Sequence, residues 1–242
     1  MKGAAIALGT FDGVHPGHKA IICAALEKAK ERGLESIIYT FTGHPMALFG
    51  KQPPLLMTDE ERLCALRRFC RVETDEFTLE YAATEPEAFV KMLVEKHGMR
   101  CAVAGFNYTF GKNGAGDTAL LNSLSAKYGF EVVIVPPVMF ENEPVSSTRI
   151  RAALEAGDVE KAARMLGYTY SLEGEIRANR GIGRSIGFPT ANITDFCARV
   201  LPADGVYATR VRVRGSVYAG VTNVGCNPTV HGDKLSVETY II

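Results

Sequence analysis

The chain has 242 residues, of which 47% are hydrophobic and 22% charged, so it is long enough to bury one large or two medium hydrophobic cores and is neither disordered nor fibrous. Its 27 basic and 27 acidic side chains balance, which argues against an overall electrostatic attraction to nucleic acid or to an anionic membrane. The N-terminus lacks a signal-peptide layout and no apolar stretch approaches membrane-spanning length, so we expect a cytoplasmic protein.

The first 167 residues alternate short apolar runs with amphipathic segments, which predicts βα units around a parallel sheet. Strands are expected over residues 4–8, 36–41, 101–104 and 131–135. Capping-box spacing predicts helix starts at Thr58 and Thr84. Glycine stops predict helix ends at Gly33, Gly98 and Gly129. Two further helices, near 147–156 and 158–166, are expected to close this half.

Residues 168–242 have a different texture, with glycine-punctuated strands in place of helices. Strands are expected over residues 173–178, 205–213, 217–221 and 235–242. Turn residues between them favour an antiparallel sheet or a small barrel. The sequence therefore predicts two domains, 1–167 and 168–242.

The turn after the first expected strand carries the strongest functional signal. Gly9 permits a tight exit from the strand, and Pro16 suits the first position of the next helix. A helix N-terminus attracts anions, and His15 and His18 fall on the same side of its first turn. This pattern indicates a phosphate-binding, nucleotide-handling turn; the alternative is a surface loop with two ordinary histidines.

Further polar segments follow the other expected strands. They carry His44, Asn107, and the run Ser147, Thr148, Arg149 and Arg151. Because ligands collect at the carboxyl ends of strands in an open α/β sheet, we expect these segments to converge on the histidine turn. Hydroxyls, helix-start amides and guanidinium groups suit a triphosphate and a departing pyrophosphate. Taken alone, the last run also fits a helix N-cap with two solvated arginines.

Nucleotidyl transfer to a phosphate acceptor needs little acid–base chemistry, because the attacking oxygen is already an anion. His15 and His18 fit the remaining task of stabilising charge on the α-phosphate and the leaving group. Hard phosphate oxygens favour Mg²⁺ as the accompanying ion. Six scattered cysteines without CxxC spacing suggest neither a zinc site nor a disulfide framework.

The run GTFDGVHPGH over residues 9–18 resembles the HxGH nucleotidyltransferases. Followed by GHP, GFNYTFGKNGAGD and SSTRIR, it is similar to the FMN adenylyltransferase part of bacterial bifunctional riboflavin kinase/FAD synthetases. GRSIGFPTAN over 183–192 resembles the flavokinase signature, and LPADGVY, NVGCNPT and VET follow in the family's order. Together these motifs span nearly the whole chain.

This resemblance implies an α/β, Rossmann-like HxGH nucleotidyltransferase domain followed by an incomplete antiparallel β-barrel of the flavokinase type. Riboflavin and ATP would give FMN, and FMN with a second ATP would give FAD and pyrophosphate. His15 and His18 match the catalytic histidines, and Glu238 matches the proposed kinase base. A base is chemically sensible because a ribityl hydroxyl must lose its proton during attack.

The resemblance also implies binding residues. Those expected to bind ATP or flavin are Gly9, Phe11, Asp12, Gly17, His44, Asn107, Ser147, Thr148, Arg151, Gly183, Arg184, Thr190, Asn192 and Asn223. Thr190 and Asn192 also match the positions that hold Mg²⁺. The alternatives are a proline turn capped by Thr190 and a solvated, strand-edge Glu238. Arg151 matches the family arginine, whereas Arg149 occupies a variable position.

The chain departs from the family at two points. Thr42-Gly43 replaces the Glu-Pro that commonly precedes His44, and the sequence stops at Ile242, where family kinase domains continue. We therefore expect intact adenylylation and weak or absent kinase activity. The expected partners are ATP, riboflavin and FMN, without nucleic acid or membrane, and the oligomeric state stays open. Two alternatives remain, namely a nucleotidyltransferase for another acceptor, such as phosphopantetheine or nicotinamide mononucleotide, and a non-catalytic flavin-binding module.

Overall fold

The computed structural model describes residues 3–177, 190–194, 196, 198–226 and 235–242. The chain divides into two compact units. The first unit contains residues 1–147 and 165–167, and the second contains residues 148–164 and 168–242.

A five-stranded parallel sheet forms the centre of the first unit, with the strand order β3-β2-β1-β4-β5. Its strands are β1 (Ala4–Leu8), β2 (Glu35–Thr42), β3 (Arg71–Glu76), β4 (Met99–Gly105) and β5 (Glu131–Val135). The fully buried β1 pairs with β2 on one side and β4 on the other. The strand order reverses at β1, so the carboxyl ends of β1 and β4 form the switch point at which such sheets bind ligands.

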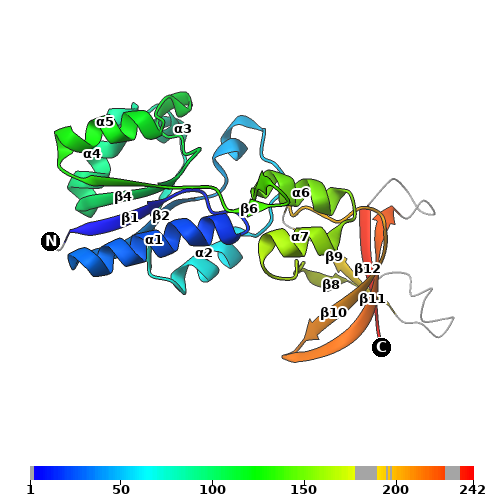
Figure 1. The fold of residues 1–242 in the computed structure, drawn as a ribbon. Helices are drawn as coiled ribbons and strands as arrows, with labels where there is room; N and C mark the ends of the chain where they lie inside the picture. Colours follow the sequence, from blue (N-terminus) through cyan, green and yellow to red (C-terminus); the bar gives the residue numbers. More distant parts are fainter. Residues whose placement is uncertain (1–2, 178–189, 195, 197, 227–234) are drawn as a thin grey trace. The chain divides into compact units, whose positions relative to one another are not determined.

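Helices cover both faces of this sheet (Figure 1). Helices α4 (Pro86–His97) and α5 (Thr118–Tyr128) pack on one face, where Ile6 and Leu8 contribute to the core. Helices α1 (Pro16–Arg32) and α2 (Asp59–Arg67) pack on the other, over Ala5 and Ala7. The remaining short elements are η1 (Pro45–Phe49), α3 (Leu79–Ala82), η2 (Lys112–Gly114), β6 (Met139–Phe140) and β7 (Glu143–Pro144). Alternate side chains of β1 thus feed two cores, as the parallel-sheet prediction requires.

Most predicted helix ends are confirmed, and one predicted start is wrong. Thr58 and Glu61 form the complete capping box, and the three predicted glycine stops lie in the left-handed region at the ends of α1, α4 and α5. Thr84 does not cap a helix, because the N-cap of α4 is Glu85 and Pro86 occupies the first turn. The fixed φ of proline sets this start one residue later than the capping-box spacing suggested.

Strand β3 was not predicted, and its sequence RVETDE is mostly charged. Within the described residues β3 pairs with β2 alone, so it is an edge strand of the sheet. An edge strand that faces solvent needs no continuous apolar run, and its ends are exposed. Pairing to a neighbour, rather than local hydrophobicity, determines this strand.

The second unit contains α6 (Ser147–Glu155) apart from its first residue, most of α7 (Val159–Leu166), and a five-stranded antiparallel sheet. The strand order is β10-β11-β12-β9-β8. Its strands are β8 (Glu175–Arg177), β9 (Thr190–Thr194), β10 (Gly205–Val213), β11 (Ser216–Cys226) and β12 (Leu235–Ile241). The predicted antiparallel sheet is confirmed, but β9 was not predicted because it lies at the end of the proline-containing signature run.

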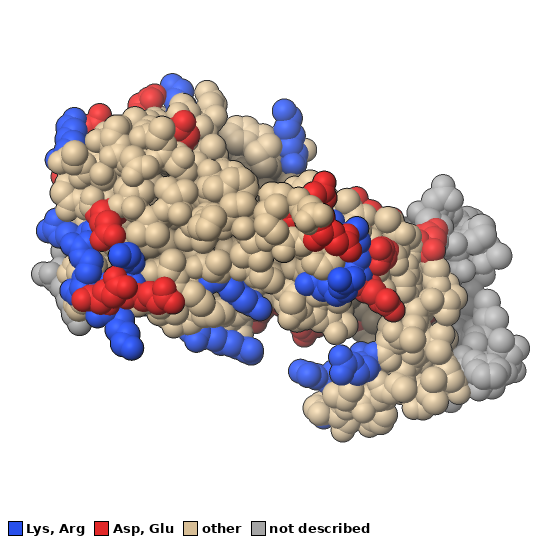
Figure 2. All heavy atoms as spheres, in the orientation of Figure 1, with Lys and Arg blue, Asp and Glu red and all other residues tan. Residues whose placement is uncertain are grey.

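Basic and acidic side chains are interspersed on the face of the molecule that Figure 2 draws. Within the first unit, Glu131 pairs with Lys28 at 3.2 Å and with Arg32 at 3.1 Å. Across the described part of the chain, no helix is both long and apolar enough to cross a membrane.

Candidate functional site

The turn between β1 and α1 has an unusual backbone. Phe11 and Val14 adopt φ values of 56° and 37°, which are rare for residues with a branched or bulky side chain. The Phe11 ring is buried against the backbone of Gly9, where an added Cβ would lie 3.0 Å from the ring. Such strain persists only where the surrounding structure fixes it, and it often marks a functional site.

His15 and His18 form one stacked pair at the start of α1. Their ring centroids lie 3.6 Å apart with an interplanar angle of 20°. His15 is the N-cap of α1, and its Nδ1 accepts a hydrogen bond of 3.4 Å from the backbone N–H of His18. This bond leaves Nε2 of His15 to carry the proton. A Cβ at Gly17 would lie 3.1 Å from the His15 ring, so glycine gives the ring its space.

Both imidazoles are neutral at physiological pH. Burial lowers the pKa of His15 to about 4, partly offset by the Asp12 carboxylate. Burial, and then the nearby His15 and Arg62, lower the pKa of His18 well below its ordinary value. Nδ1 of His18 is buried without a hydrogen-bond partner among the residues that the structure describes. The ring nitrogens of the pair at the start of α1 are therefore neutral and not fixed cations.

Asp12 anchors the segment that precedes α2. Asp12 is only 4% exposed, and its carboxylate accepts hydrogen bonds from the backbone N–H groups of Leu56, at 3.1 and 3.2 Å, and of Met57, at 3.1 Å. The carboxylate thus binds protein amides in this structure, and it fixes the loop before α2 against the histidine turn.

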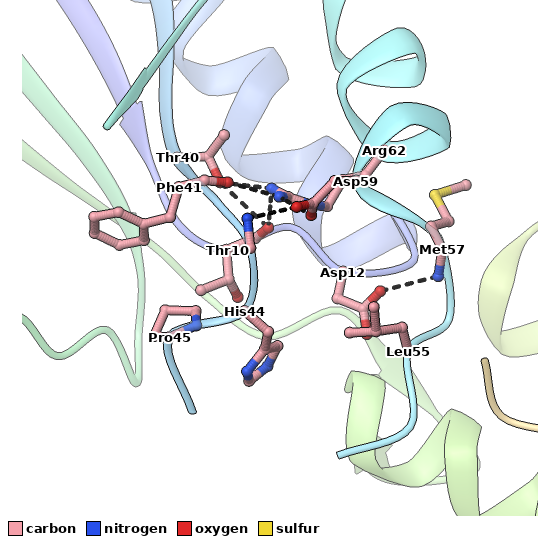
Figure 3. Close-up of a pocket in the computed structure, with 11 residues that line it drawn as sticks. Thr10, Asp12, Thr40, Phe41, His44, Pro45, Leu55, Met57, Asp59 and Arg62 are labelled. Atoms are coloured by element: carbon pink, nitrogen blue, oxygen red, sulfur yellow. Dashed lines mark hydrogen bonds and ion pairs between the residues drawn. The ribbon is translucent and has the colours of Figure 1, made fainter. Parts of the chain in front are cut away.

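A pocket opens beside Asp12 in the first unit (Figure 3). Its lining residues are Thr10, Asp12, Thr40, Phe41, Gly43, His44, Pro45, Leu55, Met57, Asp59 and Arg62. Of the residues expected from the sequence to bind ligands, Asp12 and His44 line it. His44 is the N-cap of η1 and accepts a hydrogen bond of 3.2 Å from the N–H of Met46.

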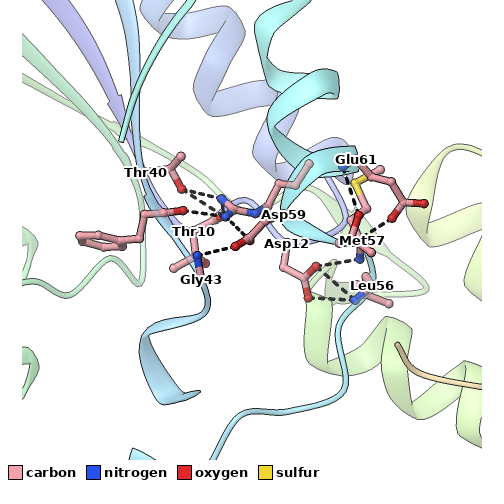
Figure 4. A network of polar contacts seen from close by, with 11 residues as sticks. Thr10, Asp12, Thr40, Gly43, Leu56, Met57, Asp59 and Glu61 are labelled. Atoms are coloured by element: carbon pink, nitrogen blue, oxygen red, sulfur yellow. Dashed lines mark hydrogen bonds and ion pairs between the residues drawn. The ribbon is translucent and has the colours of Figure 1, made fainter. Parts of the chain in front are cut away.

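Thr10, Thr40, Gly43 and Asp59 take part in one network of polar contacts (Figure 4). Arg62, which was not predicted from the sequence, contacts three of them, namely Thr10, Thr40 and Asp59 (Figure 3). Its side chain is 5% exposed and donates to the carbonyls of Thr10 and Phe41. It also forms an ion pair of 2.7 Å with Asp59. Arginine is rarely buried unless paired. The only sequence signal was the capping box of α2, which fixes where the helix starts but not which side chain faces inward.

Ser147 links the last predicted segment of the first half to the histidine turn. Its hydroxyl donates a hydrogen bond of 2.9 Å to the backbone carbonyl of Asp12. Asn107 is exposed in the turn after β4, at the same carboxyl edge of the sheet. Thr148 and Arg151 follow Ser147 in α6 and belong to the second unit.

Three of the predicted kinase residues form one row across the antiparallel sheet. Glu238 of β12 is directly opposite Asn223 of β11 and directly opposite Asn192 of β9. Directly paired residues project from the same face of a sheet with Cβ atoms about 5 Å apart. Thr190 is two positions from Asn192 in β9 and shares this face. Gly183 and Arg184 lie outside the described residues.

The opposite face of the same strands is buried. Thr222 and Thr239 are buried, and a chain of hydroxyl hydrogen bonds runs from Thr209 to Thr222 at 2.9 Å and from Thr222 to Thr239 at 2.8 Å. Because neighbouring side chains of a strand point to opposite faces, this buried chain fixes Glu238 on the outer face beside Asn223.

Comparison with known proteins gives a consistent result for both units. Residues 1–149 match the family described as FAD synthetase, and residues 166–242 match the riboflavin kinase family. A bifunctional riboflavin kinase/FMN adenylyltransferase from Listeria monocytogenes is 36% identical over 98% of this chain and 77% of its own length. The Bacillus subtilis protein of the same description is 36% identical over 93% of this chain and 73% of its own length.

A solved structure shares the fold. The crystal structure described as a macrolide-efflux protein from Streptococcus pneumoniae matches with a TM-score of 0.89 and 30% sequence identity. The match covers all of this chain and 80% of that one.

Proposed function

The chain belongs to the family of bifunctional riboflavin kinases/FMN adenylyltransferases, and on that premise we propose which of its residues perform each reaction. It is an enzyme of flavin cofactor biosynthesis, in which riboflavin is phosphorylated to FMN and FMN is adenylylated to FAD. We assign adenylylation to residues 1–167 and phosphorylation to residues 168–242.

In adenylylation, a phosphate oxygen of FMN attacks the α-phosphorus of ATP. The bond from the α-phosphorus to the bridging oxygen breaks, and pyrophosphate leaves with the electron pair. No proton has to be removed from the attacking oxygen, so the protein's task is to align the phosphates and to stabilise the developing charge.

The stacked histidines at the N-terminus of α1 carry this assignment. The Nε2–H of His15, the ring of His18 and the positive end of the α1 dipole suit the oxygens of the α-phosphate. Ser147, whose hydroxyl reaches the same turn, supports placing the triphosphate there. Thr148 and Arg151 would bind the departing pyrophosphate, and Gly9, Phe11, Gly17, Asp12, His44 and Asn107 would shape the site.

In phosphorylation, a ribityl hydroxyl attacks the γ-phosphorus of ATP, its proton passes to a base, and ADP leaves. We assign the base to Glu238, which the strand register places between Asn192 and Asn223. Thr190 and Asn192 offer hard hydroxyl and amide oxygens on one face of β9, which fit Mg²⁺. When bound, Mg²⁺ neutralises phosphate charge. Gly183 and Arg184 stay predicted ATP-binding residues, and the barrel, the cytoplasmic location and the absence of a nucleic-acid partner also stay predictions.

Product analysis tests the adenylylation assignment. The purified protein is incubated with Mg²⁺-ATP and FMN, phosphopantetheine or nicotinamide mononucleotide, and nucleotide products and pyrophosphate are quantified. We expect FAD and pyrophosphate in equal amounts with FMN, and no adenylylated product with the other acceptors. Equal or faster turnover of another acceptor, or FMN binding without pyrophosphate release, would contradict the assignment.

A further inference from the structure

Arg62 is a buried cation whose hydrogen bonds are directed to the protein. One terminal nitrogen donates to the Thr10 carbonyl at 2.9 Å and to Thr40 Oγ1 at 2.8 Å. The other donates to the Phe41 carbonyl at 2.6 Å and to Asp59 Oδ1 at 2.7 Å. Four acceptors occupy the two ends of the fork, so Arg62 is built to hold protein groups rather than to bind a substrate phosphate.

These four acceptors come from the turn after β1, from the end of β2 and from the first residue of α2. Thr10 begins the turn that leads to His15 and His18, and Phe41 lies near the end of β2, just before His44. Asp59 extends the connection, because its other oxygen accepts a hydrogen bond from the N–H of Gly43. The guanidinium of Arg62 therefore connects the turn after β1 to the end of β2 (Figure 3).

We propose that Arg62 is a positioning residue for adenylyl transfer, which holds the histidine turn and the His44 loop in one register around the pocket. This inference rests on the adenylylation function proposed above. Its effect is expected mainly in kcat, because a small displacement of aligned reacting groups lowers the rate more than it weakens binding.

The charge of Arg62 has a second effect on the histidine pair. His18 is faced by His15 from its own helix and by Arg62 from α2, and the neutral Phe11 ring packs against its edge. A cation at this position disfavours a second positive charge on His18, which supports the low pKa of that imidazole. The effects of the guanidinium geometry and of the positive charge of Arg62 can be tested separately. Lysine keeps the charge but cannot donate hydrogen bonds to four acceptors in one plane.

The test compares Arg62→Lys with Arg67→Lys in the full chain. Arg67 lies on the same helix and is exposed, so it is the matched control. We expect R62K to lower kcat for FAD formation at least about 10-fold while KM for ATP and for FMN changes less than about 3-fold, because alignment is lost. R67K should match wild type. Folded R62K protein with wild-type kcat, or a loss confined to KM, would overturn the proposal.

Two further measurements cover the remaining outcomes. If R62K does not fold, Asp59→Asn leaves Arg62 in place but weakens the link to Gly43, and it should lower kcat in the same direction; unchanged kcat would then refute the proposal. If wild-type protein makes no FAD, the adenylylation function fails separately. The positions of the two loops are then monitored through the NMR resonances of the backbone amides of Thr10 and Gly43. R62K should shift these resonances and R67K should not. Unshifted resonances in R62K would reject the positioning role of Arg62.

Discussion

The hydroxyl of Ser147 donates a 2.9 Å hydrogen bond to the backbone carbonyl of Asp12, 135 positions earlier in the chain. This bond joins the first residue of α6 to the turn that positions His15 and His18. Two segments that carry separate motifs therefore meet at one end of the parallel sheet. The convergence is the structural basis for assigning adenylyl transfer to this end.

Removing this hydroxyl should weaken the site without unfolding it. Ser147→Ala deletes one hydrogen bond, which contributes about 1 kcal/mol to stability. Because the lost contact orients the triphosphate segment, we expect kcat/KM for ATP in FAD formation to fall by roughly 10-fold, equivalent to about 1.4 kcal/mol of transition-state stabilisation. Steady-state kinetics and thermal unfolding measure both effects. Ser125→Ala, which removes an exposed hydroxyl bonded within α5, is the control and should change neither quantity; equal losses in the two variants would argue against a role for Ser147.

The buried histidines should make stability depend on pH below 6.5. The pKa of His15 falls from 6.5 to about 4 on folding, so the unfolded chain binds more protons than the folded chain between these values. The contribution of His15 to the free energy of unfolding is therefore fully present above pH 6.5. It is lost as the pH falls toward 4, and the loss is about 3 kcal/mol at roughly 1.4 kcal/mol per pKa unit.

Denaturant unfolding between pH 7 and pH 4.5 tests this linkage with His15→Asn. Asparagine is a good N-cap, so the variant preserves the start of α1 while it removes the titrating ring. The free energy of unfolding should fall less steeply with decreasing pH in the variant than in wild type. Parallel curves would show that His15 does not titrate differently in the folded and unfolded states.

Glu238→Gln should separate the two reactions. The amide keeps the shape of the side chain but cannot accept the hydroxyl proton, so riboflavin phosphorylation should fall about 100-fold or more, as for loss of a general base. FAD formation from supplied FMN should stay at the wild-type rate, which also shows that the protein is folded. Both rates come from chromatographic separation of the flavins. Undiminished phosphorylation would remove Glu238 from the role of base.

Much of the fold could be predicted because local signals agreed with the tertiary structure. The buried β1 is a continuous apolar run, and the glycine at the end of α1 provides its left-handed stop. The edge strand β3 could not be predicted, because its charged sequence is stabilised by pairing with β2. The prediction of a helix start at Thr84 was wrong, because Pro86 determines where α4 begins.

The candidate site shows the same division. His15 and His18 were evident from a short motif at a strand–helix junction. Arg62 was not evident, because its role depends on carbonyls contributed by Thr10 and Phe41, far away in sequence. A buried cation is defined by its three-dimensional partners, and a sequence pattern on α2 alone reads as a solvated arginine. Likewise, only the strand register reveals that Asn223 is opposite Glu238.

The most direct measurement is the rate of FAD formation from FMN and Mg²⁺-ATP by His18→Leu protein, relative to wild type. Retained thermal stability would show that the variant is folded. Because His18 is assigned to stabilise charge at the α-phosphate and leucine has no hydrogen-bond donor, kcat should fall by about 100-fold or more, as when a transition-state donor is removed. FAD formation by folded His18→Leu protein at the wild-type rate would contradict the assignment of adenylyl transfer to this histidine pair.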